Sequence, residues 1–454
     1  GGPGVVFLFV IVAIACAFTA FCYSEFASRI PVAGSAYTYA YSSFGELFAW
    51  IIGWALIMEY SIGNIYVAYS WSDYFTSLLQ QSGVNVPAYL STSYMEASKA
   101  FHGNVPGEAL TAWTTASEIG GLKIILDLPA LLINLVITYL VYRGVKESKN
   151  FSNLMVWIKM FVVGLIIIVG GILIFKNDLF ANWTPDNSVG IPSFMPNGFS
   201  GVMMAVSGVF FAYIGFDAVS TQAGEAINPR KDIPFAIIAS LVICTVLYIL
   251  VSLVLTGMMN YKDFDPLGQY PDAIKAPVAY AFDIAGQAWA GYIITIAATV
   301  GLISVLMVMI MGQSRIFLGM SKDGLIPQVF SKINPISGTP KTNLMILGGV
   351  IAIVAAFTPI NKLADMTSFG TLFAFTMVCI AVWILRVKQP NIERTFKVPA
   401  LPVIAVCGIL INTYLMINLS KDAQMLSLGW LAIGVVVYFL YGKRNAKLGK
   451  ENQQ

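Results

Sequence analysis

Long runs of apolar residues, separated by short polar stretches, recur along the whole chain. Most runs hold about 20 residues, the length an α-helix needs to cross a bilayer core of about 30 Å. Backbone groups in lipid must pair internally, and these runs are too long and continuous for barrel strands, so they predict helices. The predicted spans are 4–23, 44–79, 124–142, 151–175, 201–223, 233–257, 277–312, 342–358, 363–386, 401–420 and 426–441.

The composition agrees with an all-α, polytopic membrane protein. Of the 454 residues, 57% are hydrophobic and 11% charged, whereas soluble domains carry about 25% charged residues. The net charge of +3 gives no indication of nucleic-acid binding. The five cysteines lie in apolar runs without a CxxC or Cys/His cluster, so neither a disulfide framework nor a metal site is expected. The single histidine, His102, falls in the polar connection 80–123 and is interpreted as a surface residue.

The distribution of lysine and arginine predicts the orientation of the chain. Most of the 26 basic residues fall in the tail and in the connections 24–43, 143–150, 224–232, 313–341 and 387–400. This excess marks those segments as cytoplasmic. We therefore expect a multi-pass protein of the cell membrane with a cytoplasmic C-terminus. An odd number of spans then puts the N-terminus outside, and since the first residues do not resemble a signal peptide, one further span upstream is expected.

Three ionisable residues are predicted to lie well inside spans: Glu59, Lys159 and Asp217. A charge at bilayer mid-depth costs at least about 2.5–3.5 kcal/mol, so each is a functional candidate. Each also has a structural interpretation. Glu59 could be a protonated acid bonded to another helix, Lys159 could extend its stem to the interface, and Asp217 could cap a helix.

The stretch GVFFAYIGFD, which begins at Gly208, places two glycines and an acid inside an apolar run. Gly208 and Gly215 would let the backbone unwind between two half-helices, with Asp217 at the start of the second. Secondary transporters use such breaks to expose half-helix ends to a substrate. Phe210, Phe211 and Tyr213 would then form the wall of a pocket. Glycines for close helix packing, with the aromatic rings facing lipid, are the alternative.

Several stretches, in the family's own order, resemble the amino acid–polyamine–organocation (APC) superfamily. They are YSEFASRIPVAGSAYTYAYSSFGELFAWIIGW (23–54), FFAYIGFDAVSTQAGEAINPRKDIP (210–234), GQSRIFLGMSKDGLIP (312–327), SFGTLFAFTMVCIAVWILR (368–386) and ERTFKVPALP (393–402). The closest resemblance is to the cationic amino acid transporter branch and its bacterial homologues, over nearly the whole chain.

The resemblance implies a LeuT-like fold of two inverted five-helix repeats. The eleven predicted spans match the family's second to twelfth, so its first helix, which carries half of the expected site, is expected to be missing. Residues 1–175 would form the shortened first repeat and 176–386 the second. Residues 387–454 would hold the last two spans and the tail.

The resemblance also implies the site residues of the broken segment. Phe211, Ala212 and Ile214 match the part that contacts the α-amino group and the side chain of the substrate. Phe210 and Gly215 belong to the same stretch.

Further residues are implied on other spans. Glu59 matches an acid near the pocket in the cationic branch. Lys159 matches a lysine that occupies a sodium-like site in proton-coupled members. The stretch 302–309 should face the side-chain pocket, with Leu306 and Met307 as the expected contacts.

Together these features predict a transporter that imports amino acids by alternating access, driven by protons and without other cofactors. An exchanger, a facilitator or a polyamine transporter are the alternatives. No HExxH, GxSxG or pore-loop signal indicates an enzyme or a channel. The expected partners are the amino acid and the lipid bilayer, not nucleic acid, and a small single-span subunit is left open. The choice between cationic and small neutral substrates is also left open. Glu59 favours a cationic substrate, whereas the apolar surroundings of Met307 favour a small neutral one.

Overall fold

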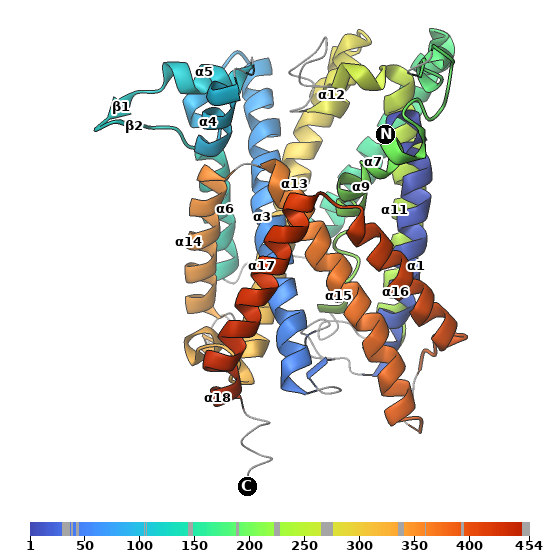
Figure 1. The fold of residues 1–454 in the computed structure, drawn as a ribbon. Helices are drawn as coiled ribbons and strands as arrows, with labels where there is room; N and C mark the ends of the chain where they lie inside the picture. Colours follow the sequence, from blue (N-terminus) through green and yellow to red (C-terminus); the bar gives the residue numbers. More distant parts are fainter. Residues whose placement is uncertain are drawn as a thin grey trace.

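The computed structural model describes residues 1–29, 37, 40–41, 45–103, 105, 107–143, 149–187, 190–221, 228–264, 276–334, 340–358, 360–391 and 395–446. Within them the chain forms a bundle of helices, most of which run along one axis (Figure 1). Seven helices are long and apolar enough to cross a membrane, and three shorter helices are also apolar. The prediction of an all-helical, polytopic membrane protein is therefore confirmed.

The main helices follow the predicted spans closely. They are α1 (Val5–Arg29), α3 (Glu46–Gln81), α6 (Leu128–Tyr142), α7 (Lys149–Lys176), α11 (Pro229–Met258), α13 (Ala288–Lys322), α14 (Lys341–Phe357), α15 (Ile360–Lys388), α16 (Leu401–Ile417) and α17 (Lys421–Val437). Short 3₁₀ segments lie at Gly2–Gly4, Ala88–Leu90, Leu179–Trp183, Tyr261–Phe264 and Gln328–Ser331. The chain continues from α17 through a π-helical turn (Tyr438–Gly442) into α18 (Lys443–Asn445).

Two regions differ from the prediction. The span expected at 277–312 is divided into α12 (Pro277–Ile284) and α13, because Gly286 adopts a φ of +73° that ends the first helix. The connection 80–123, expected to be a polar loop, contains α4 (Tyr94–Gly103), α5 (Glu108–Thr115) and a hairpin of β1 (Glu118–Ile119) and β2 (Leu122–Lys123). His102 is exposed in α4, as expected.

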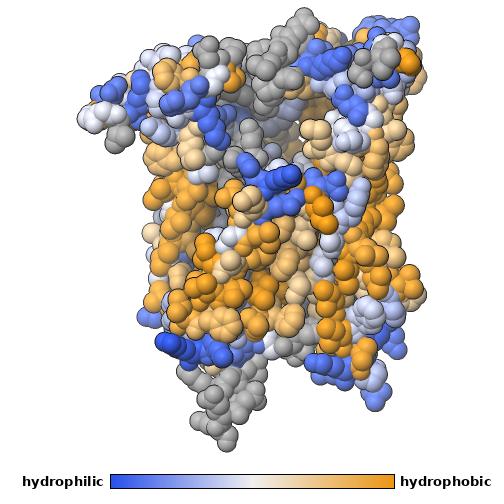
Figure 2. Space-filling model, viewed as in Figure 1, coloured by the Kyte–Doolittle hydropathy of each residue, from blue (hydrophilic) through white to orange (hydrophobic). Residues whose placement is uncertain are grey.

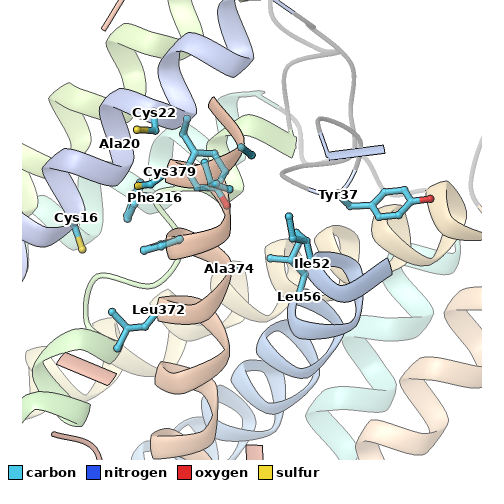
Figure 3. Close-up of a cluster of buried hydrophobic side chains, with 14 of the residues drawn as sticks. Cys16, Ala20, Cys22, Tyr37, Ile52, Leu56, Phe216, Leu372, Ala374 and Cys379 are labelled. Carbon is cyan, nitrogen blue, oxygen red and sulfur yellow. The ribbon is translucent and has the colours of Figure 1, made fainter. Parts of the chain in front are cut away.

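The outer surface follows the bilayer pattern. Figure 2 shows hydrophobic side chains over the middle of the bundle and hydrophilic ones mainly toward its two ends. The largest internal cluster gathers around α15, which contributes Leu372, Ala374 and Cys379, with Cys16 of α1 and Leu56 of α3 on either side (Figure 3). All five cysteines are free thiols.

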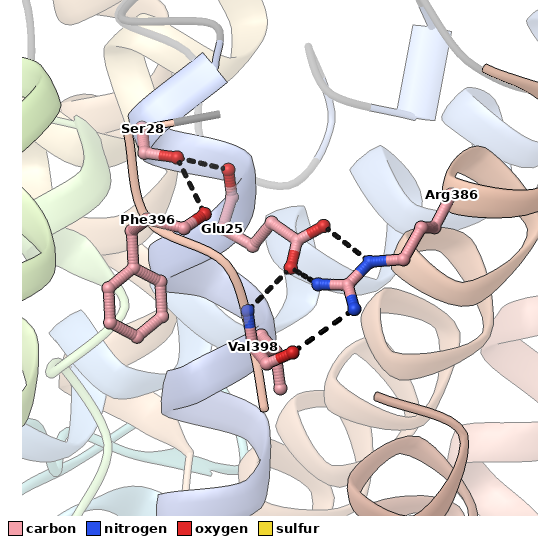
Figure 4. A network of polar contacts seen from close by, with 5 residues as sticks. All are labelled: Glu25, Ser28, Arg386, Phe396 and Val398. Carbon is pink, nitrogen blue, oxygen red and sulfur yellow. Dashed lines mark hydrogen bonds and ion pairs between the residues drawn. The ribbon is translucent and has the colours of Figure 1, made fainter. Parts of the chain in front are cut away.

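A buried ion pair joins the ends of α1 and α15. Glu25 is 4% exposed, and its carboxylate accepts bonds from Arg386 Nε at 3.1 Å and from the backbone N–H of Val398 at 2.8 Å, besides its contact with Arg386 Nη2 (Figure 4). At the end of α13, Tyr37 donates to Asp323 at 2.6 Å. Burial and the neighbouring Asp323 raise the pKa of Tyr37, so its hydroxyl stays protonated.

We expect Arg386→Met to lower the free energy of unfolding by about 3 kcal/mol, because it leaves a buried carboxylate without its counter-ion. Lys388→Met is the matched control, since Lys388 is exposed on the same helical turn, and it should change stability by less than about 0.5 kcal/mol. Equilibrium unfolding in mixed detergent micelles measures both. Equal effects of the two substitutions would contradict the structural role of the pair.

Candidate functional site

A broken helix packs against α1, α11 and α15. The run predicted at 201–223 forms three short helices, α8 (Gly198–Met203), α9 (Val206–Phe211) and α10 (Ala218–Thr221). Residues 212–217 are not helical, and the backbone N–H groups of Tyr213 and Ile214 bond only three residues back, at 2.9 and 3.2 Å. Gly215 has a φ of +114°, which a glycine adopts at no steric cost.

Gly208 does not take part in this break. The expectation that the backbone unwinds at Gly208 is corrected by the structure, in which Gly208 lies inside α9. Glycine weakens a helix without ending it, and the break occurs where Gly215 takes a backbone conformation that other residues rarely adopt.

Three neighbouring helices hold the broken segment in place. Tyr248 of α11 donates its hydroxyl to the carbonyl of Ala212 at 2.7 Å. The hydroxyl of Tyr213 donates to the carbonyl of Phe9 in α1 at 2.9 Å. On the α15 side, Ser368 donates to the carbonyl of Ser207 at 3.2 Å. These bonds satisfy backbone and side-chain groups that a broken helix would otherwise leave unpaired in an apolar interior.

Two carbonyl groups of the break remain available to a guest molecule. Those of Tyr213 and Ile214 accept no hydrogen bond from the described residues. Ala212, Ile214 and Gly215 are half-buried, whereas Tyr213 is buried. A carbonyl without a partner at membrane depth is a favourable acceptor for an ammonium group, because each unpaired polar group there costs free energy.

Two acids lie beside the break. Asp217 is fully buried and directly precedes α10, with the backbone N–H groups of Gly215 and Ala218 near its carboxylate. This position at the start of a helix is the one that the capping interpretation of Asp217 requires. Glu59 of α3 is 2% exposed and close enough to Asp217 for an electrostatic interaction. Thr371 of α15 lies beside Glu59, whose Oε2 has no hydrogen-bond partner among the described residues.

The two phenylalanines of the break differ in their surroundings. Phe211 is half-buried and packs against Tyr66 of α3, with ring centroids 4.3 Å apart. Phe210 is fully buried and packs edge-on against Phe375 of α15 at 5.9 Å. Phe211 can therefore contact a guest molecule, while Phe210 belongs to the core and not to the pocket wall expected from the sequence.

The face of α13 next to the break is not the expected one. Leu306 and Met307 lie in a core cluster with side chains of α3, α6 and α14, which corrects their expected contact with the side-chain pocket. Met309 instead packs in the cluster that contains Val209 and Tyr213 of the broken segment, and Val305 packs against both clusters. Successive residues of a helix point about 100° apart, so neighbours such as Met307 and Met309 face different partners.

Lys159 lies between α7 and α13. Its Nζ donates to the hydroxyl of Ser304 at 2.6 Å, and its stem passes close to Gly301, where an added Cβ would stand 3.1 Å from Cε. The lysine is half-buried, and its ammonium is directed toward α13. Among the described residues, no group of three or more His, Cys, Asp or Glu side chains could hold a metal ion.

These observations define a multi-pass membrane protein that holds a broken helix, the arrangement with which carriers bind a substrate. The chain belongs to the amino acid permease family, whose sequence profile matches residues 1–441. It is a membrane amino acid transporter of this family and not an enzyme. The resemblance to the APC superfamily is thereby confirmed.

Three relatives illustrate the range of the family. The chain is 40% identical to the branched-chain amino acid permease BcaP of Bacillus subtilis (strain 168), over 99% of this chain and 88% of that protein. The identity to the methylthioribose transporter of the same organism is also 40%, over the same shares. Cationic amino acid transporter 3 of Arabidopsis thaliana is 36% identical over 86% of this chain and 58% of its own length.

The two glycines give a matched test of where the helix breaks. At both Gly208 and Gly215 no heavy atom lies within 4 Å of an added Cβ, so only the backbone conformation distinguishes them. Gly215→Ala should lower the free energy of unfolding by about 1–3 kcal/mol, because alanine is strained at positive φ. Gly208→Ala should be neutral or stabilising by up to about 1 kcal/mol. Unfolding in detergent measures both, and a cost at Gly208 with none at Gly215 would contradict the described break.

Proposed function

We propose that the protein imports amino acids across the cell membrane by proton-coupled symport with alternating access. The observation that carries this proposal is the break at 212–217, with the carbonyls of Tyr213 and Ile214 open to an ammonium group. Family membership implies a LeuT-like fold, in which one helix bundle rocks against the other around a central site. Residues 1–175 and 176–386 would be its repeats.

Eleven membrane crossings and a cytoplasmic C-terminus complete the proposal. The broken segment and the three shorter apolar helices would add to the seven long spans. The excess of basic residues in the connections at one end supports the orientation.

For the substrate we favour neutral amino acids with a short aliphatic side chain. Phe211 and Ile214 at the break are apolar, and so are Val305 and Met309 of α13, which belong to the hydrophobic cluster that packs against it. The name of the B. subtilis relative BcaP agrees with this class. A cationic amino acid is the second candidate, because Glu59 carries a carboxylate oxygen without a partner among the described residues.

Uptake by purified protein in proteoliposomes tests the function. With an inward proton gradient, valine, leucine, lysine, putrescine and methylthioribose are offered in turn as labelled substrates. Saturable accumulation of an aliphatic amino acid is expected. Accumulation of putrescine or methylthioribose alone would overturn the proposed substrate class, and counterflow that is indifferent to the gradient would favour an exchanger or facilitator.

Lys159 is proposed to link proton movement to transport. Lys159→Ala should still bind substrate but lose accumulation driven by pH, because no group then carries the proton at this position. A gradient of one pH unit is worth about 1.4 kcal/mol per proton, so the loss is about tenfold at that gradient. Lys176→Ala is the control, since Lys176 is an exposed lysine in the last turn of the same helix. Full pH-driven accumulation by Lys159→Ala would remove the coupling role.

Met309 is proposed to limit the size of the side chain that the pocket accepts. Met309→Ala should weaken transport of valine by about tenfold and improve that of larger amino acids, because apolar contacts in such pockets are worth about 1–3 kcal/mol. Met307→Ala is the matched control, because Met307 packs away from the break. Competition against labelled valine measures both variants, and a specificity change caused by Met307→Ala would reverse the assignment of the two faces.

A further inference from the structure

Helices α6 and α14 lie side by side at one edge of the bundle (Figure 1). Gly348 of α14 lets the two approach closely, because its backbone lies directly against Thr138 of α6. Each helix turns a stripe of large apolar side chains outward, between 41% and 59% exposed. The stripes consist of Leu132, Leu135, Val136 and Tyr139 on α6, and of Met345, Ile346, Val350 and Ile353 on α14. The pair therefore forms a lipid-facing wall.

Two tyrosines and two cations gather where α6 ends and α14 begins. The rings of Tyr139 and Tyr142 stack 6.4 Å apart at an angle of 16°. The guanidinium of Arg143 stands 6.0 Å from the Tyr139 ring, and the ammonium of Lys341 stands 4.6 Å from the Tyr142 ring. We call these four residues the tyrosine–cation cluster. Tyr139 belongs to both the cluster and the apolar stripe, so the two surfaces are continuous.

The charged groups and hydroxyls of the cluster form no ion pair or hydrogen bond within the described part of the protein. Neither cation has a carboxylate partner there, and neither tyrosine hydroxyl makes a hydrogen bond there. Neither α6 nor α14 contains an acidic residue. Among the described residues, these two positive charges thus have no counter-ion at the end of a wall that faces hydrocarbon.

We propose that the tyrosine–cation cluster binds the headgroup of an anionic phospholipid. The phosphate would accept bonds from Arg143, Lys341 and the tyrosine hydroxyls, while the acyl chains lie along the apolar stripes. Basic pockets between spanning helices bind anionic headgroups, and tyrosines gather at the same depth. A soluble phosphate would lack the acyl contacts with the wall. This site is independent of the transport function proposed above.

The experiment titrates the full-length, delipidated protein in detergent with single lipids and counts bound lipid by native mass spectrometry. The two lipids are phosphatidylglycerol and phosphatidylcholine with identical acyl chains. Phosphatidylglycerol should bind more tightly. Arg143→Gln and Lys341→Gln should each weaken it about fivefold and the double variant about 25-fold, with phosphatidylcholine unaffected, because each cation near an anionic lipid contributes about 1 kcal/mol.

Two further variants sharpen the test. Lys388→Gln removes an exposed cation from the last turn of α15, outside the cluster, and should leave both lipids unaffected. Tyr142→Phe keeps the ring but removes the hydroxyl, and should weaken phosphatidylglycerol by less than the loss of a cation. Equal binding of the two lipids to the unmodified protein, or equal losses from Lys388→Gln and Lys341→Gln, would overturn the proposal.

Discussion

The structure depends on one constraint: a backbone polar group at membrane depth must have a partner, because water is absent there. A continuous helix meets this constraint by itself, and the break at 212–217 does not. The surrounding helices supply part of what is missing, for example through the hydroxyl of Tyr248 at the carbonyl of Ala212. The carbonyls of Tyr213 and Ile214 have no partner among the described residues. They are therefore the part of the break that can hold a substrate.

The same constraint separates two kinds of buried acid. Glu25 is held by a guanidinium and a backbone N–H, so it fastens two helix ends and needs nothing further. Glu59 is as deeply buried, yet its Oε2 has no partner among the described residues, and it lies beside the break. A buried acid with spare bonding capacity is costly for stability alone, which favours a functional interpretation for Glu59 over a purely structural one.

Much of the fold could be predicted from the sequence, because the bilayer thickness sets the length of an apolar run. The site was less predictable. A glycine two residues before an acid in an apolar run indicates a break at Gly215. No local pattern predicts that Tyr248, 36 residues beyond Ala212, bonds to it. In the stretch 305–311 of α13 every position is apolar, so the local sequence has no polar face from which to derive the rotation of the helix. Met307 and Met309 are therefore equivalent in sequence and differ only in what they pack against.

Helix α13 contacts both the proposed coupling lysine, Lys159, and the hydrophobic cluster of the broken segment. Ser304 holds the ammonium of Lys159, and the next residue, Val305, packs in the cluster that contains the broken segment. Met309 lies one turn further along the same face. Loss of the Lys159 proton would change its bond to Ser304, one residue from the proposed side-chain pocket. Since a helix moves as a rigid element, a small shift of α13 at Ser304 would displace Val305 and Met309 together. The proposed coupling lysine of α7 thus contacts the same helix that carries the proposed specificity residues, so no longer path between them is needed.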